Sequence, residues 1–226
     1  MGLVPGVSGV EGGGMIKCPV VSDQWPADKE RASLPATLRS RRSSMDISQL
    51  FFVTSNKHKV AETQAILGFP LTYVESEVPE IQSLDLREVV QAKAGAAFSF
   101  VGKPVMVEDV SLEIAAWNGL PGPFIKWFNQ TLNPAGMARL LRGEKDRTVV
   151  AREMVDIYDG SEHRLFEGRV EGTVAESPRG ESGFGFDVIF IPAGHRRTYG
   201  EMTAEEKNRI SHRALALEQV KEWLAG

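Results

Sequence analysis

Residues 105–112, VMVEDVSL, join a buried-strand pattern to two adjacent carboxylates. The first three residues are apolar on both faces, which is typical of a strand in the middle of an α/β sheet. Glu108 and Asp109 follow directly, and ligands of such sheets gather at the carboxyl ends of the strands. We therefore expect the strand to end at this pair, with one carboxylate facing a cleft because strand side chains alternate. The plain alternative is a solvated strand end.

Strand and helix patterns alternate on both sides of this stretch. The strand candidates are residues 50–54, 105–107, 148–158, 164–175 and 187–191, and the helix candidates are residues 57–68, 86–97 and 203–224. Gly68 stops the first helix, and Thr203 with Glu206 forms a capping box that opens the last one. The order predicts an α/β fold, a mixed central β-sheet flanked by helices.

The first 45 residues are a different kind of sequence. They are Gly-rich and then polar, with no lasting helical or strand period, so we expect residues 1–45 to be a disordered or loosely attached N-terminal extension and residues 46–226 to form the domain. The run TLRSRRSS favours mitochondrial targeting, but four acidic residues precede it. No apolar run approaches the roughly 20 residues that span a bilayer, so no membrane partner is expected.

Charge and cysteine content narrow the function classes. The formal net charge is −4, and residues 46–226 hold 20 basic and 26 acidic residues, a balance of −6. That balance argues against binding a nucleic acid polymer. The single cysteine, Cys18, leaves residues 46–226 without a disulfide or a cysteine-based zinc site, so we expect a cytoplasmic, reducing compartment.

Four further motifs each have a functional and a plain interpretation. TSNKHK (54–59) follows a strand and opens a helix, where backbone N–H groups attract anions, but it also fits an N-cap followed by solvated lysines. NGLPGPFIKWF (118–128) either aims Lys126 or only supports a helix. SGFGFD (182–187) either stacks on a base or forms a Gly-rich hairpin. EEKNRISHR (205–213) either flanks a bound group or is a solvated helix face.

A metal site at the strand would need a carboxylate from another segment, and Glu80 in EVPEIQS is one of many candidates. Magnesium usually takes one or two protein carboxylates together with substrate phosphates and water.

Taken together and in this order, TSNKHK, VEDVSL, GLPGPFIKWF, SPRGESGFGFDVIF and EMTAEEKNRISHRALAL resemble the inosine triphosphate pyrophosphatase family, the Ham1-like non-canonical purine nucleoside triphosphate pyrophosphatases. The resemblance runs from about residue 50 to about residue 222. It implies two lobes with a substrate cleft between them, and a homodimer. It implies hydrolysis of ITP, dITP or XTP to the monophosphate and pyrophosphate, with Mg²⁺, or Mn²⁺ as an alternative.

The resemblance also implies the site. Asp109 is the implied catalytic carboxylate and, with Glu80, holds the metal. The implied substrate-binding residues are Thr54, Ser55, Asn56, Lys57, His58, Lys59, Lys93, Asp109, Val110, Lys126, Phe184, Gly185, Phe186, Asp187, Lys207, His212 and Arg213. Three positions depart from the family pattern: Ser55 replaces glycine, Val110 replaces Thr or Ser, and Phe186 replaces Trp or Tyr.

Two rival functions remain open at this point. A Maf-like pyrophosphatase would have a similar cleft but act on other bases, and the FGFD and SHR segments favour a purine instead. A catalytically silent nucleotide-binding module is compatible with the three departures, but the carboxylates and lysines expected to do chemistry are all present.

Overall fold

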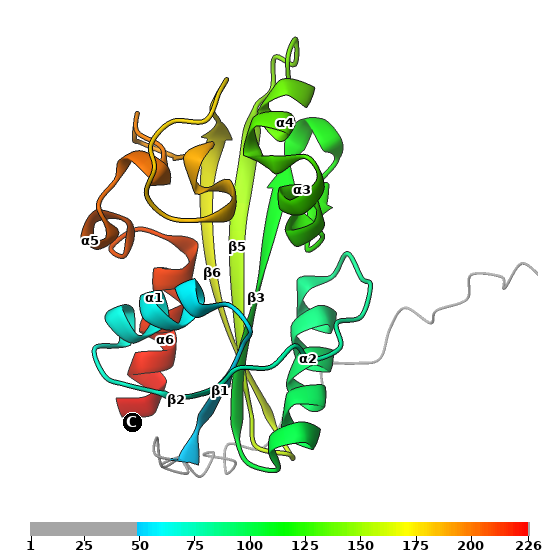
Figure 1. The fold of residues 1–226 in the computed structure, drawn as a ribbon, viewed down its shortest axis with the longest axis vertical. Helices are drawn as coiled ribbons and strands as arrows, with labels where there is room; N and C mark the ends of the chain where they lie inside the picture. The colour runs from blue at the N-terminus through cyan, green and yellow to red at the C-terminus, as the bar shows by residue number, and fades with distance from the viewer. Residues whose placement is uncertain (1–48, 226) are drawn as a thin grey trace, which may run out of the picture. The chain divides into compact units, whose positions relative to one another are not determined.

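The computed structural model describes residues 49–225 (Figure 1). The N-terminal extension and its boundary at residue 45 lie outside the described residues. Within the described range no helix is both long and apolar enough to cross a bilayer.

A seven-stranded mixed sheet forms the centre of the described part, as predicted. Its strands lie in the order β2 (Thr72–Val74), β1 (Phe51–Val53), β3 (Val105–Ile114), β5 (Thr148–Tyr158), β6 (His163–Val174) and β7 (Phe190–Pro192), and β4 (Pro121–Gly122) pairs with β3. β1 runs parallel to β2 and β3, whereas every pair from β3 onward is antiparallel.

The central strand β3 does not end at the acidic pair, so that expectation was wrong. Its ladder with β5 continues through Glu108 and Asp109 to Ile114, which pairs with Val149. A strand tolerates two carboxylates here because each meets a cation: Glu108 contacts Arg213 and Asp109 contacts Lys93. The two side chains meet cations from different helices, as alternation predicts.

The helices cover both faces of the sheet (Figure 1). α1 (Lys57–Leu67) and α6 (His212–Ala225) share one hydrophobic cluster with the sheet, and α2 (Leu86–Val101) shares another on the opposite face. A third cluster joins the far ends of β3 and β5 to α3 (Ile125–Thr131), α4 (Asn133–Leu140) and η3 (Gly185–Val188). The long strands β3, β5 and β6 thus run through two lobes, each with its own core.

The C-terminal segment departs from the prediction of one long helix. α5 (Ala204–Lys207) and α6 are separate, and the hydroxyl of Ser211 accepts from the backbone N–H of Ala214 where α6 begins. This break places Lys207 and His212 on different helices. The predicted strand 187–191 is also shorter, because Asp187 accepts from the N–H of Phe184 and holds η3 before β7 starts.

Candidate active site

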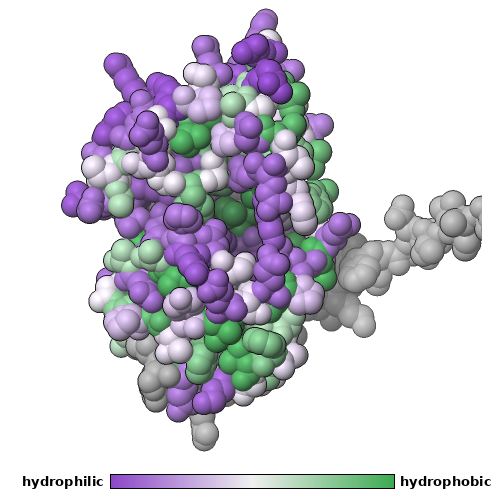
Figure 2. Space-filling view, viewed as in Figure 1, coloured by the Kyte–Doolittle hydropathy of each residue, from purple (hydrophilic) through white to green (hydrophobic). Residues whose placement is uncertain are grey.

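A cleft of about 740 Å³ opens on the face shown in Figure 2, a size typical of small-ligand sites. Its lining comes from the turn between β1 and α1, the segment 76–80, Lys93 of α2, Asp109 and Val110 of β3, the helix α3, and Phe184 with Gly185. The long strands therefore bring segments from both lobes to one cavity.

The turn between β1 and α1 is built as a helix N-terminus. The side chain of Asn56 accepts from the N–H groups of His58 (3.0 Å) and Lys59 (3.4 Å), and Thr54 Oγ1 accepts from Asn56 N (3.2 Å). Gly68 ends α1 with φ of 78°, as its sequence predicted. Ser55 is exposed at the lining of the cleft, so the turn can receive an anion at the positive end of an 11-residue helix.

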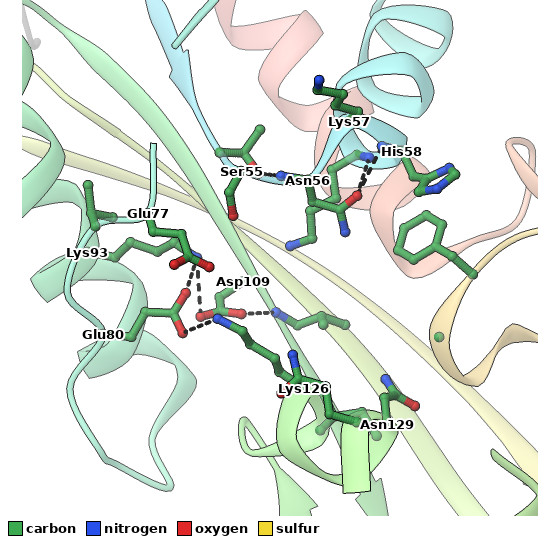
Figure 3. Close-up of a pocket in the computed structure, with 18 of the residues that line it drawn as sticks. Ser55, Asn56, Lys57, His58, Glu77, Glu80, Lys93, Asp109, Lys126 and Asn129 are labelled. Carbon is green, nitrogen blue, oxygen red and sulfur yellow. Dashed lines mark hydrogen bonds and ion pairs between the residues drawn. The ribbon is translucent and has the colours of Figure 1, made fainter. Parts of the chain in front are cut away.

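Across the cleft lies a group of four charged side chains, Glu80, Lys93, Asp109 and Lys126, which we call the open group (Figure 3). Lys93 Nζ lies 2.9 Å from Glu80 and 3.6 Å from Asp109, and Lys126 Nζ lies 3.7 Å from Glu80. Burial opposes the charge on Lys93, but Asp109 and Glu80 raise its pKa. Burial likewise opposes ionisation of Glu80, but Lys93 and Lys126 lower its pKa. Both Glu80 and Lys93 are therefore ionised at neutral pH.

The open group has the donors that a hard divalent cation requires. Glu80 and Asp109 both lie within 4 Å of one ammonium, so their oxygens converge on a single positive charge at the wall of the cleft. Residues 49–225 hold no cluster of three or more His, Cys, Asp or Glu side chains arranged for a metal. Two carboxylates suit magnesium, which keeps water and substrate phosphates as further ligands.

Behind the cleft, six charged side chains form what we call the buried cluster: Glu62, Glu108, Glu153, Asp187, Lys207 and Arg213. Lys207 Nζ lies 2.7 Å from Glu62 and 2.8 Å from Asp187. Arg213 contacts Glu62, donates to both oxygens of Glu108 (3.0 and 3.3 Å), and lies 3.2 Å from Glu153. Lys59 adds a contact of 3.3 Å to Glu108.

Burial and pairing act against each other on the acids of this cluster. Burial opposes ionisation of Glu108, but Arg213 and Lys59 lower its pKa. Burial raises the pKa of Glu153 to about 8, because Arg213 only partly offsets it. The pKa of His212 is held well below its usual range by burial, Arg213 and Lys207, so the ring is neutral at pH 7.

Phe184 separates the two sets of charges. Its ring lies 5.0 Å from Lys207 Nζ and 5.5 Å from the Arg213 guanidinium, at cation–π distance. On the cleft side it stacks against His58, with ring centroids 5.7 Å apart. The two rings therefore form an aromatic lining that a planar base can contact.

The expected site residues fall into two groups. Those that line the cleft are Thr54, Ser55, Asn56, Lys57, His58, Lys59, Glu80, Lys93, Asp109, Val110, Lys126, Phe184 and Gly185. Those that lie behind it, all buried, are Phe186, Asp187, Lys207, His212 and Arg213. Phe186 packs on His212 at 5.7 Å inside the core of its lobe, so Phe184 and not Phe186 presents its ring to the cleft.

Sequence reasoning missed several polar residues of the site: Ser76, Glu77, Asn129 and Gln130 line the cleft, and Glu62 and Glu153 lie behind it. Asn129 lines the cleft one helical turn after Lys126, and Glu62 lies three residues after Lys59 on α1, so helical spacing signals both. Glu153 carries no such signal, because an acid in a strand pattern normally points to solvent.

Comparisons with known proteins address the family to which the chain belongs. The model of the Ham1 family matches residues 50–223. A dITP/XTP pyrophosphatase of Thermococcus kodakarensis is 42% identical over 179 residues, 78% of this chain and 97% of that protein. An inosine triphosphate pyrophosphatase of Schizosaccharomyces pombe is 41% identical over 182 residues, 79% of this chain and 96% of that protein.

A solved structure of a HAM1 protein from Coxiella burnetii superposes with a TM-score of 0.68 at 30% identity, covering 78% of this chain and 98% of that one. The resemblance predicted from the ordered motifs is thereby confirmed. The chain belongs to the Ham1 family.

Proposed function

We propose that the chain hydrolyses the non-canonical purine nucleoside triphosphates ITP, dITP and XTP to the monophosphate and pyrophosphate, which removes them from the nucleotide pool. A relative named dITP/XTP pyrophosphatase and a relative named inosine triphosphate pyrophosphatase match this chain over 97% and 96% of their own lengths. The observation that carries the proposal is the convergence of Glu80 and Asp109 on Lys93 at the wall of the cleft.

The phosphate chemistry belongs to the open group and the turn before α1. Attack of water on the α-phosphorus meets an anion and expels a more highly charged leaving group, so positioned cations lower the barrier. Lys59, Lys93 and Lys126 supply such charges, and the N-terminus of α1 adds its partial positive charge. Asp109, 16% exposed in its side chain, would orient the water or accept its proton.

Nucleotide pyrophosphatases of this family generally need a divalent metal ion. Glu80 and Asp109 would hold it, and we propose Mg²⁺, with Mn²⁺ as the alternative. When bound, the ion supplies charge neutralisation to the phosphate oxygens. Lys93, which contacts both carboxylates, would supply a second positive charge beside them.

The part of the proposed site that would contact the base offers hydrogen-bond donors, which favour a 6-keto purine. Arg213 only donates hydrogen bonds, and neutral His212 donates from one ring nitrogen. Hypoxanthine and xanthine offer an acceptor at O6, where adenine carries an amino group. An unpaired buried donor costs about 1–3 kcal/mol, which is enough to discriminate against ATP. Guanine shares O6, so its exclusion requires contacts elsewhere on the base.

Three further attributes are part of the proposal. We place the protein in the cytoplasm and expect a homodimer. We also keep the division into an extension, residues 1–45, and a catalytic domain, residues 46–226.

Product analysis tests the activity. Purified full-length protein with ITP and Mg²⁺ is expected to release inosine monophosphate and pyrophosphate in equal amounts, and chelation of the metal is expected to abolish release. Binding of ITP without turnover would instead support the silent module. Preferred turnover of a modified pyrimidine triphosphate would support the Maf-like alternative.

A further inference from the structure

Glu153 is the least satisfied acid of the buried cluster. It lies in the middle of β5 with no exposed surface, and within residues 49–225 neither carboxylate oxygen has a hydrogen-bond partner. Arg213 Nη2 lies 3.2 Å from Oε2, at ion-pair distance but without hydrogen-bond geometry. A buried polar group without a hydrogen bond is costly, so its retention in the fold requires an explanation.

His212, a neighbour of Glu153, also has a buried polar atom without a hydrogen-bond partner. Its ring is buried, Nε2 lies 3.9 Å from Glu153 Oε2, and Nδ1 has no hydrogen-bond partner among the described residues. The sheet is built to bring the two together: Gly168 of β6 pairs with Glu153, and a Cβ at Gly168 would lie 1.8 Å from the carbonyl oxygen of His212. Only glycine lets the first turn of α6 rest on the sheet beside Glu153.

The charges around Glu153 decide which form it takes. Arg213 and His212 face it from α6, Glu108 from β3 and Lys59 from α1, while Asp109 lies on the other face of β3 and acts on it only through its charge. Arg213 also contacts Glu62, the remaining acid on α1, while β6 presents only glycine at position 168.

Glu108 takes two hydrogen bonds from Arg213 and a contact from Lys59, so Glu108 carries the negative charge. Burial raises the pKa of Glu153 to about 8, so Glu153 keeps its proton at neutral pH. The other acids of the buried cluster each contact a base: Glu108 contacts Lys59 and Arg213, Glu62 contacts Lys207 and Arg213, and Asp187 contacts Lys207.

We propose that Glu153 is a specificity-determining positioning residue, whose protonated carboxyl donates to Nε2 of His212 and so fixes the tautomer that carries its hydrogen on Nδ1. This inference rests on the proposed function, in which His212 donates to O6 of the base; the donor would be Nδ1–H, which is buried behind the cleft and has no partner among the described residues. The contact forms when the 3.9 Å separation shortens by about 1 Å, within reach of side-chain rotation.

The ionised form of Glu153 would have the opposite effect. A carboxylate accepts a hydrogen bond, so it would draw the hydrogen to Nε2 and leave Nδ1 as an acceptor. An acceptor suits the amino group of adenine instead of a keto oxygen. The proton on Glu153 thus decides which base the histidine prefers.

Glu153→Leu tests this assignment, because leucine has a similar size and cannot donate. The ratio of kcat/KM for ITP to kcat/KM for ATP is expected to fall about 10-fold, mainly through KM for ITP. Glu153→Gln is expected to restore most of the ratio, since its amide can donate to Nε2. In the wild type the ratio is expected to decline above pH 8, and in Glu153→Gln it is expected to hold.

Asp156→Asn is the matched control. Asp156 is a fully buried acid three residues along the same strand, but it pairs with His163 at 2.6 Å, away from α6. Its replacement is expected to change stability and leave the ITP to ATP ratio within about twofold.

A second measurement needs no variant. Nitrogen NMR of the histidine rings in the wild type at pH 7 is expected to show His212 protonated at Nδ1 and not at Nε2. Protonation at Nε2, or an unchanged ratio in Glu153→Leu, would overturn the assignment. Absence of ITP hydrolysis in the wild type would instead refute the proposed function. The NMR result would still test whether Glu153 fixes the tautomer of His212.

Discussion

The open group and the buried cluster use the same residue types for opposite purposes. In the open group, Lys126 is 47% and Glu80 31% exposed in their side chains, while Asp109 is 16% and Lys93 11% exposed. In the buried cluster, Arg213 is 3% exposed and Glu153 is not exposed at all. The open group holds two carboxylates around one lysine at a cavity wall, and the buried cluster matches most of its charges within the chain.

The difference follows from the cost of removing charge from water. A buried charge must find its partners within the fold, so the buried cluster is tied to stability. An exposed charge can remain partly paired, because water supplies the rest until a ligand arrives. We therefore expect damage to the open group to lower activity with the fold intact, and damage to the buried cluster to lower both.

The largest expected effect is at Asp109. Asp109→Asn keeps the shape of the side chain but removes its negative charge and basicity, so kcat/KM for ITP is expected to fall about 10²- to 10⁴-fold with little change in stability. Asp146→Asn, an exposed acid in a turn, is the matched control and is expected to keep wild-type turnover. Near-wild-type pyrophosphate release from Asp109→Asn would exclude the residue from the mechanism.

Arg213→Ala is expected to have the next largest effect, on folding. The change removes the cation that Glu62, Glu108 and Glu153 all contact. The free energy of unfolding in urea is therefore expected to fall by about 3–5 kcal/mol. Arg152→Ala is the control, since Arg152 also contacts two carboxylates but is 28% exposed, and a loss of at most about 1 kcal/mol is expected there. Equal losses in the two variants would contradict the comparison.

Glu153→Gln is expected to change the pH dependence of stability. The folded pKa of about 8 lies above the ordinary value of 4.5, so between those values the unfolded chain has lost a proton that the folded chain retains. This group therefore lowers wild-type stability as the pH rises from 4.5 to 8, and has no further effect above 8. The stability gain of Glu153→Gln over the wild type is expected to grow across that window by about 4 kcal/mol. A gain independent of pH, measured by urea unfolding at pH 5 and pH 8, would place the proton elsewhere.

The smallest expected effect is at Lys126. Lys126→Ala removes a half-exposed phosphate contact, so KM for ITP is expected to rise about fivefold, with the free energy of unfolding changed by less than about 0.5 kcal/mol. Lys221→Ala, an exposed lysine on α6, is the control and is expected to change neither value. If Lys126→Ala lowered the free energy of unfolding by more than about 0.5 kcal/mol while Lys221→Ala did not, the distinction between the two regions would be contradicted.

Much of the open group was predictable from the sequence. The strand around Asp109 and the helices that carry Lys93 and Lys126 are elements that local patterns identify, whereas the N-cap of α1 is Asn56 and not the Thr or Ser that the pattern favoured. The sequence also placed Glu108 and Asp109 on opposite faces. It did not show that β3 continues past them, because that depends on Arg213, more than 100 residues further along the chain.

The buried cluster was harder to predict for a physical reason. Each of its contacts joins residues far apart in sequence, such as Arg213 with Glu62 and Lys207 with Asp187. The alternation of polar and apolar residues also misleads here, because an acid within a strand pattern, such as Glu153, is normally expected to face solvent. Only the glycine at 168 signals close approach of another backbone, and its partner is visible only in the fold.

One measurement tests most directly whether the two regions act on one substrate: kcat/KM for ITP and for ATP, from pyrophosphate release by the same protein with Mg²⁺. If the open group performs the chemistry and the buried cluster reads the base, ITP is expected to exceed ATP by at least about 10-fold. Equal specificity constants for ITP and ATP would contradict the account, because the buried donors would then play no part in choosing the substrate.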